Sequence, residues 1–398
     1  MEKLDRKHIV FKKDQLYLHK HNLHELVAKK KTPFYAYSEK VLEENYKRFK
    51  KSISQNKQNG LICFALKSNN NIDVLKKLAS MGAGADIVSG GELKQALKAG
   101  IKANKIVFSG VGKTKNEIIL GLKENILSFN VESIQELELI NSLAKKMNTK
   151  AKIAFRLNPK VIAKTHKHIS TGFKTHKFGI LEKDILSSLD NSSLWSNTKL
   201  IGLSVHIGSQ LTCLKATEEA IKNMCQCANK IPFKLKFLDV GGGLGVNYAK
   251  NSKAPSVESY VSKINSIIKK NYGAVKVIYE PGRCISASCG FFITKVIRTK
   301  VSEDCRFTIV DGGMNDFVRP SLYDAFHEIF ASVNSSLTFP TDIVGPICET
   351  ADCFGTAREL PELVENDFIV IADTGAYGHT MSSHYNMRSK PKEFFLKK

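Results

Sequence analysis

The chain has 398 residues, of which 42% are hydrophobic and 25% charged, and its formal net charge is +22 at pH 7. This length exceeds the roughly 250–300 residues at which a single hydrophobic core stops growing, so two domains are expected. No apolar run approaches the ~20 residues of a membrane-spanning helix, and the charged N-terminal segment lacks the apolar core of a secretory signal. A cytoplasmic protein without a membrane partner is therefore predicted.

The excess of basic residues, 60 Lys and Arg against 38 Asp and Glu, raises the question of a nucleic-acid partner. The lysines are spread along the chain in short groups such as residues 29–31, with no Arg-rich or aromatic-interleaved block. This distribution argues against nucleic-acid binding. The nine cysteines include no Cys-x-x-Cys pair, so neither a metal site nor a disulfide framework is indicated.

Short apolar strands alternate with helices from residue 33 onward, after a polar segment with a strand-like stretch at 15–19 and a short helix at 23–30. The helices are recognised by Leu, Ile and Ala at spacings of three and four. Strands are expected at residues 34–37, 62–66, 84–88, 105–108, 126–130, 153–157, 203–206, 237–240 and 275–279. Helices are expected at residues 39–52, 72–81, 91–99, 115–124, 134–147, 183–188, 213–230 and 257–270.

This alternation indicates an α/β fold with a parallel sheet, and the number of units favours a (β/α)8 barrel of the TIM type at residues 36–285. The alternation stops after Arg283. Residues 291–300, 306–310, 331–337 and 368–372 are β-rich without long helices between them. A second, antiparallel β-barrel or sandwich domain is therefore expected, formed by residues 1–35 and 286–398.

Lys67 ends the apolar run of residues 61–66, where a buried strand would not otherwise include a charge. An ammonium group there is costly to desolvate unless it is paired or has reacted, and desolvation lowers its pKa toward the range of a nucleophilic amine. The alternative is a strand-end lysine whose amine reaches solvent. The motifs elsewhere in the chain distinguish a reactive lysine from a strand-end lysine that reaches solvent.

Other polar residues follow the predicted strands, at the barrel edge where functional side chains of such folds gather. Asp86 closes one strand, and His206 closes another and shares its loop with Ser209. Ser109 and Asn130 occupy similar positions but are interpreted as helix-capping residues. Asp86 and His206 are therefore the stronger candidates for a functional site.

The stretch Asp239-Val-Gly-Gly-Gly-Leu-Gly245 predicts a phosphate site, because consecutive glycines such as Gly242 and Gly243 let backbone N–H groups converge on an anion. It lacks the Gly-x-Gly-x-x-Gly spacing of dinucleotide sites, and tight turns need glycine for other reasons as well. Glu280 follows the apolar residues 275–279 and should require a cationic or N–H partner.

A reactive lysine, a phosphate cradle and a poorly solvated carboxylate together describe a site for pyridoxal 5'-phosphate. In such a site Lys67 forms the Schiff base, the glycines and Ser209 bind the phosphate, and Glu280 keeps the pyridine nitrogen protonated.

The motifs resemble, in order, those of the alanine-racemase-like (fold type III) pyridoxal-phosphate decarboxylases. The motifs that carry this resemblance are residues 64–68, 206–209, 241–245, 280–283, 348–349 and 375–377. Residues 169–172 through 177–179, 314–323, 345–350 and 385–388 are similar, more narrowly, to the diaminopimelate decarboxylase family. The resemblance implies decarboxylation of meso-2,6-diaminopimelate to L-lysine and CO₂, the last step of lysine biosynthesis.

The resemblance also implies roles for individual residues. The catalytic residues would be Lys67, His206, which stacks on the cofactor ring, and Cys348, with Cys348 or Lys67 returning a proton to Cα. The cofactor would contact Lys67, Asp86, His206, Ser209, Gly242, Gly243, Glu280, Gly282, Arg283 and Tyr377. The substrate would contact Arg283, Arg319, Tyr323, Glu349 and Tyr377.

Several alternatives stay open at this stage. Cys348 is also compatible with a buried structural thiol, and Arg319 and Tyr323 with ordinary surface or interface groups. The resemblance implies a homodimer in which Cys348 and Glu349 reach the other subunit's cofactor. Competing functions are decarboxylation of ornithine or carboxynorspermidine, or cofactor binding without activity. Ala351 and Cys353 depart from the pattern expected after Glu349.

Overall fold

The computed structural model describes residues 8–161, 177–303 and 305–398. It contains two compact units. The first, here called the β unit, comprises the described residues of Met1–Glu44, Asn247–Lys253 and Ile285–Lys398. The second, the barrel unit, comprises the described residues of Asn45–Val246 and Ala254–Cys284.

The barrel unit contains a closed barrel of parallel strands, which confirms the predicted (β/α)8 architecture. Its strands are β5 (Gly60–Ala65), β6 (Gly84–Ile87), β7 (Ile106–Phe108), β8 (Ser128–Val131), β9 (Ala151–Arg156), β10 (Thr198–Ser204), β11 (Phe237–Asp239) and β12 (Lys276–Tyr279). The barrel closes where β12 pairs with β5, with Val277 opposite Gly60. Parallel strands that are buried on both faces read as continuous apolar runs, which is why the pattern was visible in the sequence.

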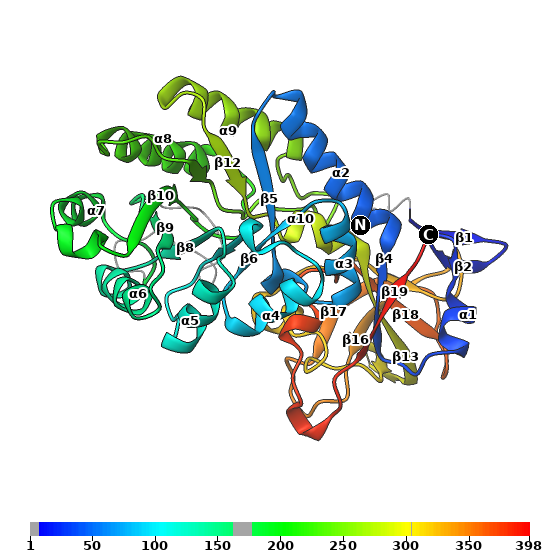
Figure 1. Ribbon diagram of the computed structural model, residues 1–398. Coiled ribbons are helices and arrows are strands. Elements are labelled where there is room, and N and C mark those ends of the chain that lie inside the picture. The colour runs from blue at the N-terminus through cyan, green and yellow to red at the C-terminus, as the bar shows by residue number, and fades with distance from the viewer. Residues whose placement is uncertain (1–7, 162–176, 304) are drawn as a thin grey trace. The chain divides into compact units, whose positions relative to one another are not determined.

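Helices follow the barrel strands in the order that Figure 1 shows, and most begin at a polar capping residue. Asn71, Ser89, Ser133 and Ser256 each accept a hydrogen bond from a backbone N–H of the first turn. Thr114 forms a reciprocal capping box with Glu117. The helices are α3 (Ile72–Ser80), α4 (Gly90–Lys98), α5 (Lys115–Lys123), α6 (Ile134–Lys146), α7 (Glu182–Leu189), α8 (Lys215–Lys230) and α9 (Val257–Asn271).

A cluster of buried side chains packs between strands around the barrel. It includes Leu61 on β5, Phe237 on β11 and Ile278 on β12. Gly202 makes room for Phe237, because a Cβ atom there would lie 2.4 Å from the Phe237 ring. Side chains alternate along a strand, so the faces that carry Phe237 and Ile278 carry Asp239 and Glu280 two residues later. The barrel core thus continues directly into a polar layer.

The β unit is built around a mostly antiparallel sheet in the order β15-β18-β13-β14-β16-β17. Its strands are β13 (Gly290–Ser302), β14 (Cys305–Val310), β15 (Ile329–Ala331), β16 (Phe339–Val344), β17 (Cys353–Leu360) and β18 (Phe368–Ala372). β4 (Phe34–Ser38) pairs with β13 and with β19 (Lys392–Leu396). The unit also contains β1 (Ile9–Lys12), β2 (Gln15–Leu18), β3 (His21–Asn22), α1 (Leu23–Ala28) and α11 (Arg319–Tyr323).

Two expectations about individual strands are wrong. Residues 34–37 do not begin the barrel series, because β4 pairs antiparallel with β13 in the β unit. Residues 331–337 do not form a strand, since β15 ends at Ala331 and β16 begins at Phe339. The helix predicted at 39–52 is α2 (Glu39–Gln55), and the boundary between the two units falls within it.

No helix in the three described ranges is both long enough and apolar enough to cross a membrane.

Replacing Ile278 by Ala should lower the free energy of unfolding by about 2–5 kcal/mol, because it leaves a cavity in the fully buried cluster of the barrel. Denaturant-induced unfolding measures this loss. Lys199→Ala, at an exposed position of β10, is the control and should change the free energy by less than about 0.5 kcal/mol. Equal losses in the two variants would contradict the assigned core.

Candidate functional site

A cavity of about 340 Å³ lies in the barrel unit, lined by side chains at and just after the carboxyl ends of the strands. Parallel barrels place their functional groups at this edge. Three residues predicted from the sequence, Lys67, His206 and Glu280, line this cavity together. Other lining residues, among them Ser109, Asn130 and Arg156, were not assigned to the site from the sequence.

Lys67 reaches the cavity because the chain turns in a short 3₁₀ helix (Leu66–Ser68) directly after β5. Its Nζ lies 2.8 Å from Oδ2 of Asp86, a fully buried carboxylate on β6. The other Asp86 oxygen, Oδ1, has no hydrogen-bond partner within the described residues. The Lys67 side chain is 36% exposed, so its amine is both held by a buried carboxylate and accessible from the cavity.

Glu280 and Asp239 form a hydrogen-bonded pair of buried carboxyl groups at the ends of neighbouring strands. Burial raises the pKa of Asp239 to about 6. Burial, together with the charges of Asp239 and Asp86, raises the pKa of Glu280 well above its usual range. The pair therefore keeps a proton to higher pH than ordinary carboxyl groups do, and Glu280 is the member that binds it more tightly.

Asn130 lies between these groups, so its interpretation as a capping residue is wrong. Its Nδ2 donates to Asp239 Oδ2 and Ser109 Oγ, both at 3.2 Å, and lies 3.5 Å from Glu280 Oε1. The helix that follows is capped by Ser133 instead. Asn130 thus links three polar side chains that end different strands.

His206 follows β10, and its Nδ1 accepts a hydrogen bond from the Gly242 N–H at 3.3 Å. Burial lowers its pKa well below the usual range, and the charges of Lys67 and Arg156 lower it further. The imidazole is therefore neutral at pH 7, with its proton on Nε2. A neutral ring offers a flat apolar face to the cavity.

Arg156, the last residue of β9, is a site residue that sequence reasoning missed. Its Nη1 donates to Glu132 Oε1 at 2.6 Å, and its Nη2 donates to the His206 carbonyl at 3.4 Å. Glu132 also accepts a hydrogen bond from the Gly179 N–H at 2.8 Å. An arginine at the end of an apolar strand is the same sequence signal that identified Lys67, and it would have pointed to this residue.

The glycine loop, residues 241–245, has no room for side chains at Gly242 and Gly243. A Cβ atom at Gly242 would lie 2.1 Å from the Glu280 carbonyl oxygen, and one at Gly243 would lie 2.2 Å from that of Gly208. Gly243 also has φ +93°, a conformation that favours glycine. Nearby, Arg283 Nη2 donates to Ser209 Oγ at 3.0 Å.

Gly282 is confined in the same way, because a Cβ atom there would lie 2.8 Å from Ser68 Oγ. The barrel unit thus contains the glycines, Ser209 and Arg283, which are the groups expected to bind a phosphate.

The predicted substrate residues of the β unit lie on two of its segments. Arg319, on α11, is only 5% exposed, so it is not an ordinary surface group. Its Nε donates to His327 Nε2 at 3.4 Å, and its guanidinium lies 5.2 Å from the centroid of the Tyr248 ring. Tyr323 ends the same helix and is half-buried. Tyr377 follows β18 with φ +57° and is also half-buried.

Cys348 and Glu349 lie in the loop between β16 and β17, and both are exposed. The interpretation of Cys348 as a buried structural thiol is therefore wrong. The loop is fixed by Asp352, which accepts hydrogen bonds from the N–H groups of Met314 and Ile347, both at 2.6 Å.

Further contacts hold this loop within the β unit. Ser321 Oγ donates to the Ala351 carbonyl at 2.6 Å, which joins the loop to α11, and the Tyr385 hydroxyl donates to Glu349. The β unit thus brings the segments of Arg319, Tyr323, Cys348 and Glu349 together. The motif at residues 169–172 lies outside the described residues.

Comparison with known families gives a match to the pyridoxal-dependent decarboxylases. The model of their pyridoxal-binding domain matches residues 39–287.

Similar proteins of known name are diaminopimelate decarboxylases. That of Helicobacter pylori strain J99 is 43% identical over 94% of this chain and 93% of its own length. That of Aquifex aeolicus is 39% identical over 98% of this chain and 92% of its own length.

Among solved structures, diaminopimelate decarboxylase of Helicobacter pylori in complex with L-lysine has a TM-score of 0.90 at 42% identity, covering 94% of each chain. The enzyme of M. jannaschii in co-complex with L-lysine has a TM-score of 0.93 at 35% identity, covering 99% of this chain and 94% of that one. A lysine/ornithine decarboxylase from Vibrio vulnificus, 22% identical with a TM-score of 0.82, shares the fold.

The pH dependence of stability should report the shared proton of Asp239 and Glu280. Because folding raises both pKa values, the folded state binds more protons than the unfolded chain, and stability falls as pH rises. In the cofactor-free protein, the free energy of unfolding of the wild type relative to Asp239→Asn should decrease by at least about 1 kcal/mol between about pH 4 and pH 8. Urea unfolding at a series of pH values measures this difference, and a difference independent of pH would contradict the assignment.

Proposed function

We propose that the chain, which belongs to the diaminopimelate decarboxylase family of the pyridoxal-dependent decarboxylases, converts meso-2,6-diaminopimelate to L-lysine and CO₂. This reaction is the last step of lysine biosynthesis. The main observation that supports the proposal is that Lys67, His206 and Glu280 line the same cavity. Similarity over nearly the whole chain supports the same substrate.

The residues of the barrel unit fit pyridoxal 5'-phosphate. A cavity-facing amine is held by a buried carboxylate, Asp86, whose second oxygen has no hydrogen-bond partner in the described part of the chain. The glycine loop packs so closely on the backbone of Glu280 and Gly208 that only glycine fits at Gly242 and Gly243. Lys67 would hold the cofactor covalently, with Gly242, Gly243, Gly282, Ser209 and Arg283 at the phosphate and Tyr377 contributed by the β unit.

When bound, the cofactor supplies a protonated pyridine ring that accepts the electron pair left behind by departing CO₂. Glu280 would maintain that protonation, because its carboxyl group, facing the ring nitrogen, would pair with the positive charge of the protonated ring. Asn130 and Asp239 position Glu280 through their hydrogen bonds. His206, being neutral, would add no positive charge beside the ring, on which it would stack.

The β unit supplies groups that suit a substrate with two carboxylates and two amines. Arg319, with Arg283 and the Tyr323 hydroxyl, binds the carboxylate that is not lost, because guanidinium groups match carboxylates in a planar, bidentate geometry. Glu349 binds the distal ammonium group. A substrate without the second carboxylate leaves buried arginine donors unpaired, which discriminates more strongly than a missing methylene group.

Cys348 is the proposed donor of the proton that replaces CO₂ at Cα, with Lys67 as the alternative. Cys348 and Glu349 are exposed in the chain, as expected of residues that act in a neighbouring subunit. We infer a cytoplasmic homodimer with shared active sites, in which residues 1–35 and 286–398 complete the site formed by residues 36–285.

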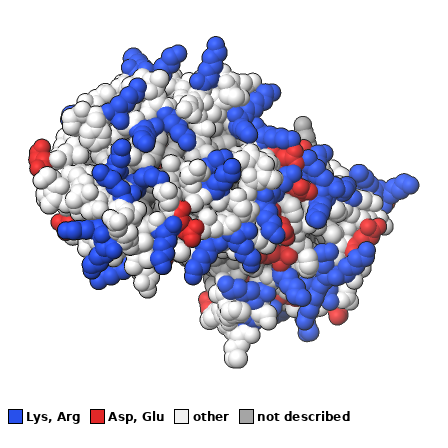
Figure 2. All heavy atoms as spheres, viewed as in Figure 1, with Lys and Arg blue, Asp and Glu red and all other residues white. Residues whose placement is uncertain are grey.

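No nucleic-acid partner is proposed. On the face shown in Figure 2, Lys and Arg side chains are scattered among uncharged residues and Asp and Glu side chains. A nucleic-acid site would be expected to gather them in one patch or stripe.

Purified protein loaded with pyridoxal phosphate should release CO₂ and L-lysine in equal amounts from meso-diaminopimelate. Ornithine and carboxynorspermidine, which lack the same arrangement of two carboxylates and two amines, should react at least about 100-fold more slowly in kcat/KM. Turnover of ornithine without turnover of meso-diaminopimelate would contradict the proposed substrate.

Mixing two inactive variants tests the shared active site. Lys67→Ala and Cys348→Ala should each be nearly inactive as homodimers. Random subunit exchange makes about half of the dimers mixed, and each mixed dimer has one intact site of two, so about one quarter of wild-type activity should return. Each variant incubated alone is the control, and no recovery on mixing would show that the sites are not shared.

A further inference from the structure

The carboxylate of Glu132, the first residue after β8, connects two segments that line the cavity of the barrel unit. Its Oε1 accepts a hydrogen bond from Arg156 Nη1 at 2.6 Å, and its Oε2 accepts one from the Gly179 N–H at 2.8 Å. Arg156 and Phe178, the neighbour of Gly179, both line the cavity, whereas Glu132 lies behind them. The Glu132 side chain is 2% exposed, so both contacts are shielded from water.

Arg156 connects Glu132 to two other cavity residues. Its Nη2 donates to the His206 carbonyl at 3.4 Å, and its guanidinium lies 4.7 Å from the centroid of the Phe178 ring. A guanidinium group that a carboxylate holds at one edge has a fixed plane. Its other edge and its face can therefore fix the position of a carbonyl group and of an aromatic ring.

The segment that carries Phe178 lies against the end of β9. The Ile180 N–H donates to the Arg156 carbonyl at 2.8 Å. Gly179 has φ +77°, and a Cβ atom there would lie 3.2 Å from the same carbonyl oxygen. The segment thus approaches the strand closely, and the contact of the Gly179 N–H with Glu132 holds it beside the cavity.

A buried ion pair fixes the backbone of Glu132. Glu136 Oε2 accepts from the Glu132 N–H at 2.9 Å, and Glu136 Oε1 lies 2.7 Å from Lys113 Nζ. The Lys113 side chain has no exposed surface, and its Nζ also donates to the carbonyl groups of Gly110 and Asn130, at 2.7 and 2.8 Å. The end of β8, which carries both Asn130 and Glu132, is therefore held in one position.

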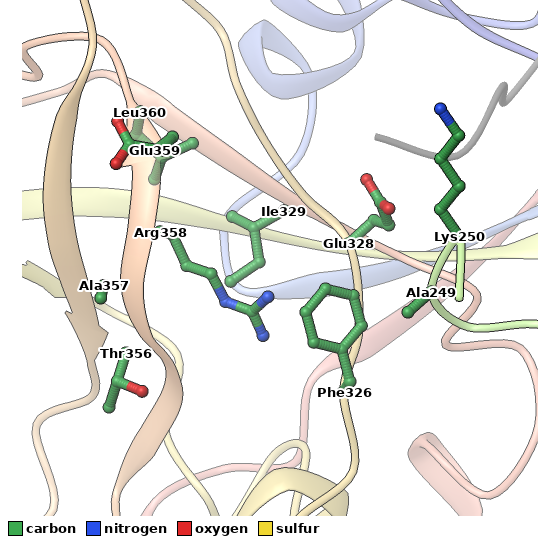
Figure 3. A pocket seen from close by; sticks show the side chains of 10 residues that line it. All are labelled: Ala249, Lys250, Phe326, Glu328, Ile329, Thr356, Ala357, Arg358, Glu359 and Leu360. Carbon is green, nitrogen blue, oxygen red and sulfur yellow. The ribbon is translucent and has the colours of Figure 1, made fainter. Parts of the chain in front are cut away.

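An arginine that stacks on a phenylalanine is not specific to this cavity. Figure 3 shows a second cavity, of about 290 Å³, in the β unit, where Arg358 lies beside Phe326 with its Cζ 3.9 Å from the ring centroid. The buried ion pair with Glu132 is therefore the contact that sets the orientation of Arg156, and stacking on Phe178 follows from it.

We propose that Glu132 is a positioning residue of the decarboxylase site, which aligns His206 through Arg156. It also holds Phe178 at the cavity through the Gly179 N–H. The inference rests on the proposed function, because His206 and Phe178 would border the bound cofactor. Buried ion pairs are a weak source of net stability, so the geometry that these pairs impose accounts for them better than stability does.

Glu132→Gln tests the proposal, because it keeps the size of the side chain but offers one acceptor oxygen to two donors. In the cofactor-loaded enzyme, kcat for meso-diaminopimelate should fall at least about tenfold, since misplacement by about 1 Å can cost about 100-fold. KM should change by less than about twofold, because the substrate groups proposed on the β unit are untouched. The visible circular dichroism of the bound cofactor, recorded without substrate, should also change, because it reports the surroundings of the ring.

Glu258→Gln is the matched control. Glu258 forms a two-bond ion pair with Arg48 in the same unit, at 2.7 and 2.8 Å, and neither residue lines the cavity. This variant should keep the wild-type kcat and circular dichroism. Arg156→Lys tests the same contact from its other side, and it serves if Glu132→Gln folds poorly. It keeps the charge but loses the planar donor geometry, so it should change the circular dichroism of the cofactor as well.

Wild-type kcat and wild-type circular dichroism in folded Glu132→Gln and Arg156→Lys would overturn the proposal. A failure of the proposed reaction would look different. Turnover of meso-diaminopimelate would then be absent from the wild type too, while the change in cofactor circular dichroism between the wild type and Glu132→Gln would persist.

Discussion

Three buried carboxyl groups, those of Asp86, Asp239 and Glu280, meet where the strands of the barrel end. Carboxylates in such a place cannot all stay charged without compensation. Asp86 is compensated by Lys67 at 2.8 Å, whereas Asp239 and Glu280 share a proton beside Asn130. The charge state of the site is therefore set by the barrel itself, before any ligand binds. It comprises a paired amine, a protonated carboxyl group and, at His206, a neutral imidazole.

The architecture of the barrel unit could be predicted because its strands are buried on both faces and its helices start at polar capping residues. An apolar run was misleading at β4. Its residues are all buried, so it was taken for the first strand of the barrel series, but it pairs with β13 and β19 in the β unit. Pairing between strands more than 200 residues apart cannot be recognised from the local sequence of either strand. Strands β16 and β17 were missed because their burial is mixed and their register is irregular, so neither forms an apolar run.

The site could be predicted where a charged or polar residue ends an apolar run, as at Lys67 and Glu280. Asn130 was misjudged because an amide after a strand is equally typical of a helix cap, and only barrel closure places it near Asp239 and Glu280. Asp239 was noticed only as the first residue of the glycine motif. Its coupling to Glu280 arises because β11 and β12 pair side by side, with Asp239 opposite Ile278. The exposure of Cys348 is likewise a property of loop packing, which residue type does not encode.

Covalent attachment of the cofactor tests the central claim most directly. Borohydride reduction of the enzyme loaded with pyridoxal phosphate, followed by proteolysis and mass spectrometry, should place a phosphopyridoxyl group on the peptide that contains Lys67. Lys67→Arg should remove this label and the visible absorbance of the bound cofactor, while Lys105→Arg, a barrel-unit lysine whose Nζ bonds the Gly82 carbonyl at 3.0 Å, should keep both. A label on another lysine, or full labelling of Lys67→Arg, would contradict the assignment of Lys67.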